Sequence, residues 1–231
     1  MIEHSTRDPL AAFDGVTMSF GVSGSKVAVI RQISLEAFPG ELLVLLGPSG
    51  SGKTTLLTLM AGLLPPTEGS VSLFGNPIQN HNLNELQHLR ATRIGFVFQT
   101  FLLIDALTVL ENVLLVLRFA GCPAKNARER ARQVLARLHI GHLGARFPGT
   151  LSQGEKQRVG VARAIANSAE LLLADEPTAS LESAQGLEII RLLYAYAHDR
   201  KAAVVVATHD LRIVEYADRV LKIEDGRLLE G

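Results

Sequence analysis

A glycine-rich stretch in the first quarter of the chain carries the residue types that bind phosphate. It fits the pattern G-x-x-x-x-G-K-[ST] and consists of Gly47, Pro48, Ser49, Gly50, Ser51, Gly52, Lys53 and Thr54, with Thr55 next in the chain. The glycines let backbone N–H groups turn toward a phosphate, and a helix that starts at the end of the loop adds the positive end of its dipole. In this pattern Lys53 reaches the β- and γ-phosphates of ATP, and the hydroxyl group of Thr54 binds Mg²⁺. The sequence therefore predicts a Mg-ATP site, with a turn that only caps a helix as the alternative.

A second candidate is the acidic pair Asp175-Glu176, which follows an apolar run. Acids at the carboxyl end of a buried strand can meet phosphates that are bound at the same edge of a sheet. We expect Asp175 to hold Mg²⁺ through water and Glu176 to polarise the water that attacks the γ-phosphate. The alternative is that both acids are simply exposed at a strand end.

These residues need a sheet to bring them together. Four apolar runs have the pattern of strands buried on both faces: 41–46, 94–98, 171–175 and 204–208. The first of them leads into the glycine-rich loop, and residues 54–64 are predicted to form the helix that follows, ended by Pro65 and Pro66. Helical patterns between the strands predict a wound α/β core with a mostly parallel sheet and flanking helices, and the glycine-rich motif indicates the P-loop NTPase type of this core.

Two further features surround this core. Apolar residues alternate with polar ones over 16–20 and again over 27–35, which predicts two half-buried strands and an antiparallel β flank. The pattern from about 76 onward is mostly helical, which predicts an inserted helical subdomain. The expected organisation is one domain of residues 1–231, with a core of 10–75 and 160–231 and a helical subdomain of about 76–159.

Composition narrows the class of protein. Of the 231 residues 47% are apolar, enough for a buried core, and 23 basic side chains balance 23 acidic ones, so no net charge favours nucleic acid. The single cysteine, Cys122, excludes an internal disulfide, and residues 1–9 lack the apolar segment of a secretion signal. The most apolar stretch, 101–119, contains charged residues and Asn112, so we do not expect it to cross a bilayer. A cytoplasmic protein is expected.

The pentapeptide Leu-Ser-Gln-Gly-Glu at 151–155, followed by Lys-Gln-Arg, resembles the signature of ATP-binding cassette (ABC) ATPases. The resemblance covers nearly the whole chain, with the motifs in the expected order. It implies that Gln99 binds Mg²⁺ and senses the partner, that His209 contacts the γ-phosphate, and that Phe20 stacks on adenine. Val16, Met18 and Phe20 alternate with polar residues, so all three would lie on the same apolar face of the predicted strand. The alternative is therefore that Phe20 is simply part of the hydrophobic core.

The resemblance also implies a homodimer in which residues act across the interface. The implied signature residues, acting on the ATP of the other subunit, are Ser152, Gln153, Gly154 and Glu155, and the loop linking the two ATP sites is Ser180, Leu181 and Glu182. The chain departs from the commonest family form at Gln153, Glu155 and Glu182. Ser152 and Glu155 also have the spacing of a capping box, which would turn the Glu155 carboxylate back toward the Ser152 N–H and away from a phosphate.

The segments 93–99, 101–103 and 107–113 resemble the branch of lipoprotein-release, macrolide-export and FtsE-type division ATPases, and also ATPases of glycolipid exporters. The resemblance implies a separate integral membrane permease, with or without a periplasmic adaptor, and attachment to the inner face of the cell membrane through it. The expected cargo is a lipid, a lipoprotein or a small hydrophobic molecule. The alternatives are an FtsE-like ATPase that regulates cell-wall enzymes and a soluble ATP-driven clamp, although the chain lacks the coiled-coil insertion or second cassette of clamp relatives.

The apolar segment just after Gln99 is a candidate contact for the permease. Its residues Phe101, Leu102, Leu103 and Leu107 could offer a surface for an amphipathic helix. A partner bound there would lie only two residues from the expected nucleotide contact. The alternative is that these side chains are core.

Overall fold

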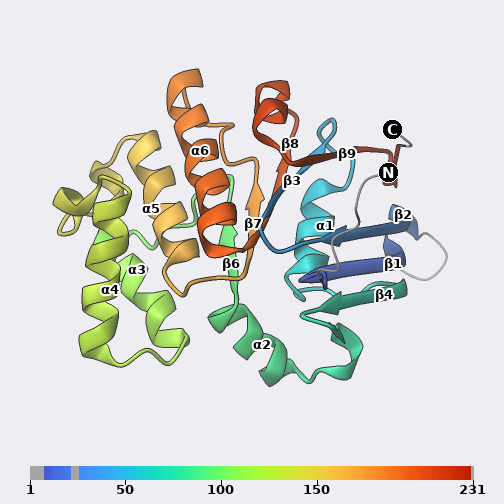
Figure 1. Ribbon diagram of the computed structural model, residues 1–231, viewed down its shortest axis with the longest axis horizontal. Coiled ribbons are helices and arrows are strands. Elements are labelled where there is room, and N and C mark those ends of the chain that lie inside the picture. Colours follow the sequence, from blue (N-terminus) through green and yellow to red (C-terminus); the bar gives the residue numbers. More distant parts are fainter. Residues whose placement is uncertain (1–7, 22–25, 230–231) are drawn as a thin grey trace.

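The computed structural model describes residues 8–21 and 26–229, in which two β-sheets pack together and helices cover them (Figure 1). The predicted absence of a secretion signal rests on residues 1–9, and of these residues 1–7 lie outside the described range. The strands are β1 (Ala11–Phe20), β2 (Val27–Ala37), β3 (Glu41–Leu46), β4 (Glu68–Leu73), β5 (Asn76–Pro77), β6 (Ile94–Val97), β7 (Leu171–Asp175), β8 (Ala203–Thr208), β9 (Arg219–Glu224) and β10 (Arg227–Leu228). The helices are α1 (Lys53–Met60), α2 (Leu83–Thr92), α3 (Val109–Phe119), α4 (Ala124–Arg137), α5 (Gln153–Ile165) and α6 (Ser183–Arg200), and short 3-10 turns include η4 (Leu211–Tyr216).

The six-stranded sheet has the order β10-β9-β3-β8-β7-β6, and its strands from β9 to β6 are parallel. Side chains alternate between its faces, and both faces are buried. On β8, Val204 and Val206 join one hydrophobic cluster with the helices α3 to α6, whereas Val205 joins a second cluster with α1 and the other sheet. The predicted strands buried on both faces are therefore present. Because parallel strands end at one edge, the segments after β3, β6, β7 and β8 meet there.

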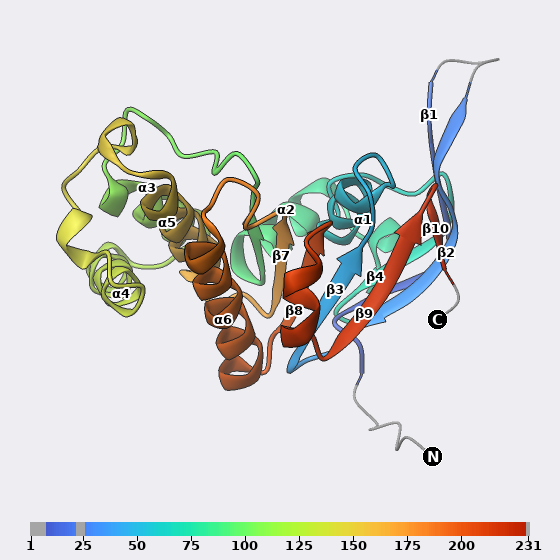
Figure 2. The same ribbon diagram turned by 90° about the horizontal axis from the view of Figure 1, so that it is seen from above.

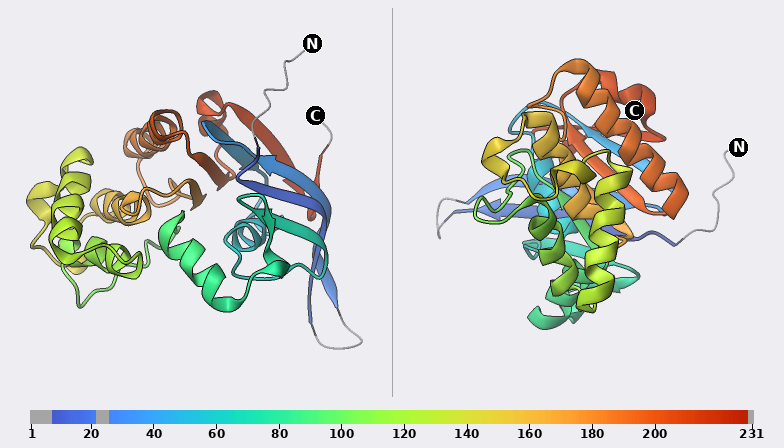
Figure 3. Two further views of the ribbon diagram at one scale, coloured as in Figure 1. Left: turned by 60° about the horizontal axis from the view of Figure 1, so that its bottom comes forward. Right: turned by 90° about the vertical axis from the view of Figure 1, so that its left-hand side faces the viewer.

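The four-stranded sheet, in the order β2-β1-β4-β5, is the predicted antiparallel flank. Its apolar face packs against α1, with Val16 and Ile33 buried between the layers. Figures 1 and 2 show this sheet at one end of the molecule and the helices α3, α4 and α5 at the other end. The left-hand view of Figure 3 shows the same separation.

Two details differ from the sequence-based expectations. The helix after the glycine-rich loop ends at Met60 instead of continuing to 64, because Gly62 takes a left-handed conformation with φ of 60° and reverses the chain first. Residues 94–98, predicted as a buried strand, contain β6, which pairs with β7 in the central sheet although it lies inside the range of about 76–159 assigned to the helical subdomain. Its short apolar run is buried against both layers, so the helical part of this range that stands apart from the sheet begins at α3.

In the part of the chain that the structure describes, no helix combines the length and the apolar character needed to cross a membrane. The apolar stretch 101–119 contains α3 and an irregular segment before it. Asn112, which interrupts that stretch in the sequence, is buried, and its side chain bonds the backbone of Ile104, Leu107 and Thr108. The polar residue therefore fixes the irregular segment to α3.

Candidate functional site

The glycine-rich loop runs from the end of β3 to the start of α1, as the motif requires. Gly52, the residue before α1, has φ of 102°, and a Cβ atom there would lie 2.6 Å from Cδ1 of Ile30, so only glycine fits. The side chain of Lys53 is 6% exposed, and its Nζ donates hydrogen bonds to the carbonyl oxygens of Gly47 at 2.7 Å and Pro48 at 2.9 Å. The loop thus curls around its own lysine and holds a positive charge at the edge of the sheet.

Thr54 and Asp175 meet at this edge although 121 residues separate them in the sequence. The Thr54 hydroxyl donates a 2.8 Å hydrogen bond to Oδ2 of Asp175, while Oδ1 of Asp175 is buried without a hydrogen-bond partner among the described residues. Burial raises the pKa of the Asp175 carboxyl, opposed by the hydrogen bond from Thr54. An orphaned carboxylate oxygen beside a hydroxyl group is a donor set that suits Mg²⁺. The residues predicted to hold the metal therefore fit it.

Glu176 lies at the centre of a polar cluster. Its Oε1 is 2.8 Å from Nδ1 of His209 and 3.8 Å from Nζ of Lys53, and its Oε2 accepts a 3.1 Å hydrogen bond from Thr208. The backbone of Glu176 has φ of 46°, a left-handed conformation that costs free energy and is found at functional sites. Its N–H donates to the carbonyl oxygen of Ala207, which ties the strained residue to β8. The carboxylate is therefore fixed in position by groups from two segments, the end of β8 and the phosphate loop.

A cavity of about 320 Å³ unites most of the predicted nucleotide residues. It is lined by Val29, Ser49, Gly50, Gly52, Lys53, Thr54, Thr55, Gln99, Asp175, Glu176 and His209. Gly47, Pro48 and Ser51 belong to the loop but do not line this cavity, and Oγ of Ser51 is buried without a hydrogen-bond partner among the described residues. The structure thus brings the glycine-rich loop, Gln99, the acidic pair and His209 to one place.

Phe20 lies elsewhere, at the end of β1. It is 43% exposed, whereas Val16 and Met18 on the same strand are buried. The plain-core alternative for Phe20 is therefore wrong. Its ring is free to contact a ligand or a partner, and adenine stacking stays a prediction.

Two residues that contribute to this region were not predicted from the sequence. Thr208, next to His209 in the chain, bonds both Glu176 and the N–H of Asp210. Arg163 of α5 donates hydrogen bonds to the carbonyl oxygens of Phe101, at 2.7 Å, and Leu102. Phe101 and Leu102 have left-handed φ angles of 61° and 46°, and Arg163 holds this strained turn beside Gln99. Adjacency to His209 could have indicated Thr208, but no sequence signal marks Arg163, because its contact is purely tertiary.

The signature residues line a different and smaller cavity, of about 240 Å³. It includes Ser152, Gly154, Glu155 and Leu181. The predicted capping box is present: the Ser152 N–H donates to Oε2 of Glu155 at 2.7 Å, and the Glu155 N–H donates to Oγ of Ser152 at 3.3 Å. The bond from the Ser152 N–H lowers the pKa of Glu155. Within one chain, the signature residues therefore do not meet the phosphate loop. They lie around the N-terminal end of α5, in a separate cavity.

The other two residues of the inter-site loop, Ser180 and Glu182, are exposed next to that cavity, and Glu182 is the residue before α6. Gln153 is exposed at the start of α5. A Cβ atom on Gly154 would lie 2.5 Å from Oε1 of Gln185, so the end of the Gln185 side chain packs directly against this glycine. The signature and the inter-site loop thus form one surface.

An apolar groove of about 650 Å³ lies between α2, β6, α3 and α5. Of the four residues predicted to contact the permease only Leu102 lines it; Leu103 packs against the core, and Phe101 and Leu107 are half-buried outside the lining. The groove is formed instead by Phe96, Phe98, Leu102, Leu115, Val116 and Phe119, with polar residues that include Arg163. Leu102 is 55% exposed and Phe119 is 67% exposed. The predicted segment therefore contributes only Leu102 to a groove whose other walls are α2, β6, α3 and α5.

Known proteins are similar to this chain in sequence. A family model described as ABC transporter matches residues 30–179. LolD 2 of Caulobacter vibrioides, a lipoprotein-releasing system ATP-binding protein, is 39% identical over 222 residues, which are 96% of this chain and 97% of that protein. HrtA of Staphylococcus haemolyticus, provisionally named a hemin import ATP-binding protein, is 37% identical over 92% of this chain and 96% of its own. The chain spans 63% of the length of three mycobacterial ABC transporter ATP-binding proteins to which it is 44% identical.

Solved structures of similar proteins have the same fold. The dimeric structure of the ABC transporter cassette MJ0796 superposes with a TM-score of 0.88 and 34% identity, covering 95% of this chain and 97% of that one. A second dimeric structure of MJ0796, in a post-hydrolysis state with ADP and Pi bound, superposes with a TM-score of 0.87 and 35% identity over the same shares of the two chains. These likenesses confirm the predicted fold class, an α/β core with an antiparallel flank and a helical lobe.

Proposed function

Because this chain belongs to the ABC transporter family and is an ATPase of that family, we propose that it hydrolyses Mg-ATP in a sandwich dimer and thereby drives a separate membrane permease. The observation that carries this proposal is the cavity in which the glycine-rich loop, Gln99, Asp175, Glu176 and His209 meet. Each has the chemistry that a phosphoryl transfer to water requires.

In this proposal the chain's own groups divide the work. Lys53 and the N–H groups of the loop bind the β- and γ-phosphates. Glu176 accepts a hydrogen bond from the attacking water and draws its proton, while His209 and Thr208 hold the Glu176 carboxylate in place. Mg²⁺, when bound by Thr54, Asp175 and Gln99, would offset phosphate charge. The role of Gln99 is to report the state of this site to the loop that Arg163 holds.

The position of the signature supports a shared site. Ser152 and Gly154 lie at the exposed N-terminal end of α5, in a cavity separate from the phosphate loop. The N-terminus of a helix attracts anions, so this end of α5 is suited to a γ-phosphate held by a second copy of the chain. The MJ0796 cassette is dimeric in its solved structures. We infer that two copies close around two ATP molecules and open when the γ-phosphate leaves.

The permease is expected to contact the groove lined by Leu102 and Phe119. An exposed apolar groove of this size fits an amphipathic helix. Phe101 and Leu102 follow Gln99 closely, so movement at the nucleotide reaches one wall of the groove directly. The chain would then act at the cytoplasmic face of the membrane, attached through the permease.

For the cargo, we propose export or extraction of a lipid, a lipoprotein or a small hydrophobic molecule. The support is the 39% identity to LolD 2, whose name assigns it to lipoprotein release. The test is reconstitution of the chain with the permease that co-purifies with it, in vesicles loaded with fluorescent lipid, acylated peptide or hemin. ATP-dependent extraction or export of one of these by the wild type, and not by Glu176→Gln, is expected. Inward movement of hemin alone would contradict the proposed direction.

A further inference from the structure

We propose that the groove between α4, α5 and α6 binds a small amphiphilic anion, a molecule with a carboxylate or phosphate head and a single apolar tail. The groove holds about 670 Å³, which lies in the range of roughly 300–1,000 Å³ that is typical of small-molecule sites. It shares no lining residue with the nucleotide cavity. Ser168, which lines it, precedes β7 and so lies at the edge of the sheet opposite the phosphate loop.

The floor of the groove is apolar. It is formed by Val134 of α4 and Leu138 just after that helix, Val161 and Ile165 of α5, and Leu192, Leu193 and Tyr196 of α6. The Tyr196 hydroxyl donates a 2.8 Å hydrogen bond to the carbonyl oxygen of Ala169, and burial raises its pKa to about 12. The phenol therefore stays protonated and its ring is fixed as part of the groove. This floor offers contact to a hydrocarbon tail.

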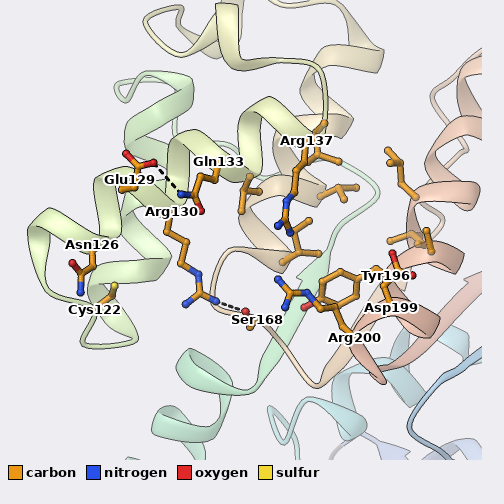
Figure 4. A pocket seen from close by; sticks show the side chains of 17 residues that line it. Cys122, Asn126, Glu129, Arg130, Gln133, Arg137, Ser168, Tyr196, Asp199 and Arg200 are labelled. Carbon is orange, nitrogen blue, oxygen red and sulfur yellow. Dashed lines mark hydrogen bonds between the residues drawn. The ribbon is translucent and has the colours of Figure 1, made fainter.

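Three arginines surround this floor. Figure 4 shows the guanidinium groups of Arg137, from α4, and Arg200, from α6, pointing toward the same space, with that of Arg130 reaching in beside Ser168. Arg130 donates a hydrogen bond to Oγ of Ser168. In the described part of the chain, neither the Arg137 nor the Arg200 guanidinium has a hydrogen bond or an ion pair. Both side chains are exposed, and an oxyanion bound between their guanidinium groups would accept charge-assisted hydrogen bonds from both.

The acidic residues of the groove do not neutralise these arginines. Glu129 accepts a 2.9 Å hydrogen bond from Gln133 at the rim, and Asp199 forms no ion pair among the described residues. In Figure 4 both carboxylates point away from the space between Arg137 and Arg200. Guanidinium groups form paired hydrogen bonds with carboxylate and phosphate oxygens, so the arrangement is complementary to either head group.

The apolar floor and the arginines together determine which class of ligand fits the groove. A free phosphate would leave the apolar floor uncovered, and a neutral apolar molecule would leave the arginines without a partner. A ligand that joins both features satisfies the whole groove. It would contact the later turns of α5 and α6, two helices whose first residues carry or follow the signature and the inter-site loop.

Calorimetric titration of the full chain with decyl phosphate and decanoate, below their micelle concentrations, tests the proposal. Saturating Mg-ADP keeps the phosphate loop filled, so that failure here is separate from failure of the proposed ATPase. The double variant Arg137→Gln/Arg200→Gln should bind at least about tenfold more weakly than the wild type, since charge-assisted hydrogen bonds are lost. The control Arg128→Gln/Arg132→Gln removes two charges from α4 outside this groove and should bind as the wild type does.

A second readout needs no variant. Cys122 is the only cysteine of the chain and lines the groove, so a thiol reagent labels it specifically. Decyl phosphate should slow the labelling of the wild type and of the Arg128→Gln/Arg132→Gln control, but not of Arg137→Gln/Arg200→Gln. Inorganic phosphate and decanol should each protect far less at equal concentration.

Four results would overturn the proposal. They are equal binding of inorganic phosphate, equal binding of decanol, no binding of decyl phosphate or decanoate, and no dependence on Arg137 and Arg200. A further experiment measures binding of the chain to vesicles of a two-chain anionic lipid. If they recruit the chain through these arginines while the single-chain probes do not bind, the groove is a membrane contact and the proposal is wrong.

Discussion

Nδ1 of His209 lies 2.8 Å from Oε1 of Glu176, and this contact joins the ends of two neighbouring parallel strands. Thr208 holds the other carboxylate oxygen at 3.1 Å. The Glu176 side chain is 12% exposed, so it faces the cavity with little freedom to rotate. A carboxylate fixed in this way is suited to orient one water molecule rather than to bind the nucleotide.

Replacing Glu176 by glutamine should therefore remove turnover while nucleotide affinity is retained. The amide keeps the shape of the side chain but cannot take a proton, and loss of a general base costs roughly 10²–10⁴-fold in rate. Phosphate release at saturating ATP measures the rate, and a fluorescent ATP analogue measures affinity. Glu215→Gln, at an exposed position on η4, is the matched control. Parental turnover in Glu176→Gln would show that another group activates the water.

Lys53→Ala should have the opposite profile and lose nucleotide affinity. The Lys53 ammonium group lies within the loop and is expected to bind the phosphates in the ground state, so its removal should weaken ATP binding by at least about tenfold. Equilibrium titration with the same analogue checks this, with the exposed Lys125→Ala as control. Unchanged affinity in Lys53→Ala would contradict the assigned role of the loop.

Charges placed in the groove of α3 should separate the chain from its permease. Leu102→Glu and Phe119→Glu alter exposed side chains, so both variants should fold and bind ATP as the wild type does. Co-purification with the permease should be lost. Leu83→Glu, which alters a residue 83% exposed on α2 outside the groove lining, should co-purify normally. Normal assembly of Leu102→Glu and Phe119→Glu would place the docking site elsewhere.

Glu155 should stabilise the chain through its cap on α5. Glu155→Ala removes the bond to the Ser152 N–H and should lower the free energy of unfolding by about 1 kcal/mol near neutral pH. Because that bond lowers the pKa of Glu155 in the folded chain, the contribution is complete above the ordinary value of 4.5 and fades as pH falls through the lowered value. Urea unfolding from pH 7 to 3 measures this. Glu155→Gln can still cap and should lack the pH dependence; a constant difference between Glu155→Ala and wild type across the range would contradict the account.

The sequence predicted those parts of the site that depend on local pattern. The glycine-rich loop, Asp175, Glu176 and His209 follow apolar strands, and parallel strands bring their carboxyl ends to one edge whatever the details of packing. The capping box of Ser152 was visible for the same reason, because its hydrogen bonds span three residues.

Features that depend on contacts between residues far apart in the sequence could not be predicted from it. The bonds from Arg163 to the carbonyl oxygens of Phe101 and Leu102 cross about 60 residues and fix an irregular turn that periodicity does not describe. This turn decides that Leu102 lines the groove while Leu103 packs into the core. The exposure of Phe20 likewise depends on where β1 extends beyond the layers that cover Val16.

In the proposed dimer, two copies of the chain share each ATP through the signature. Light scattering of Glu176→Gln with saturating Mg-ATP tests this sharing, because this variant should hold the γ-phosphate that joins the copies. The variant Glu176→Gln with Ser152→Arg, which blocks the N-terminal end of α5, serves as the matched control.

Glu176→Gln should have twice the monomer mass in Mg-ATP, and the monomer mass in Mg-ADP and in the combination with Ser152→Arg. A Glu176→Gln protein that binds ATP and remains a monomer, or a dimer that persists with Ser152→Arg, would contradict the shared site.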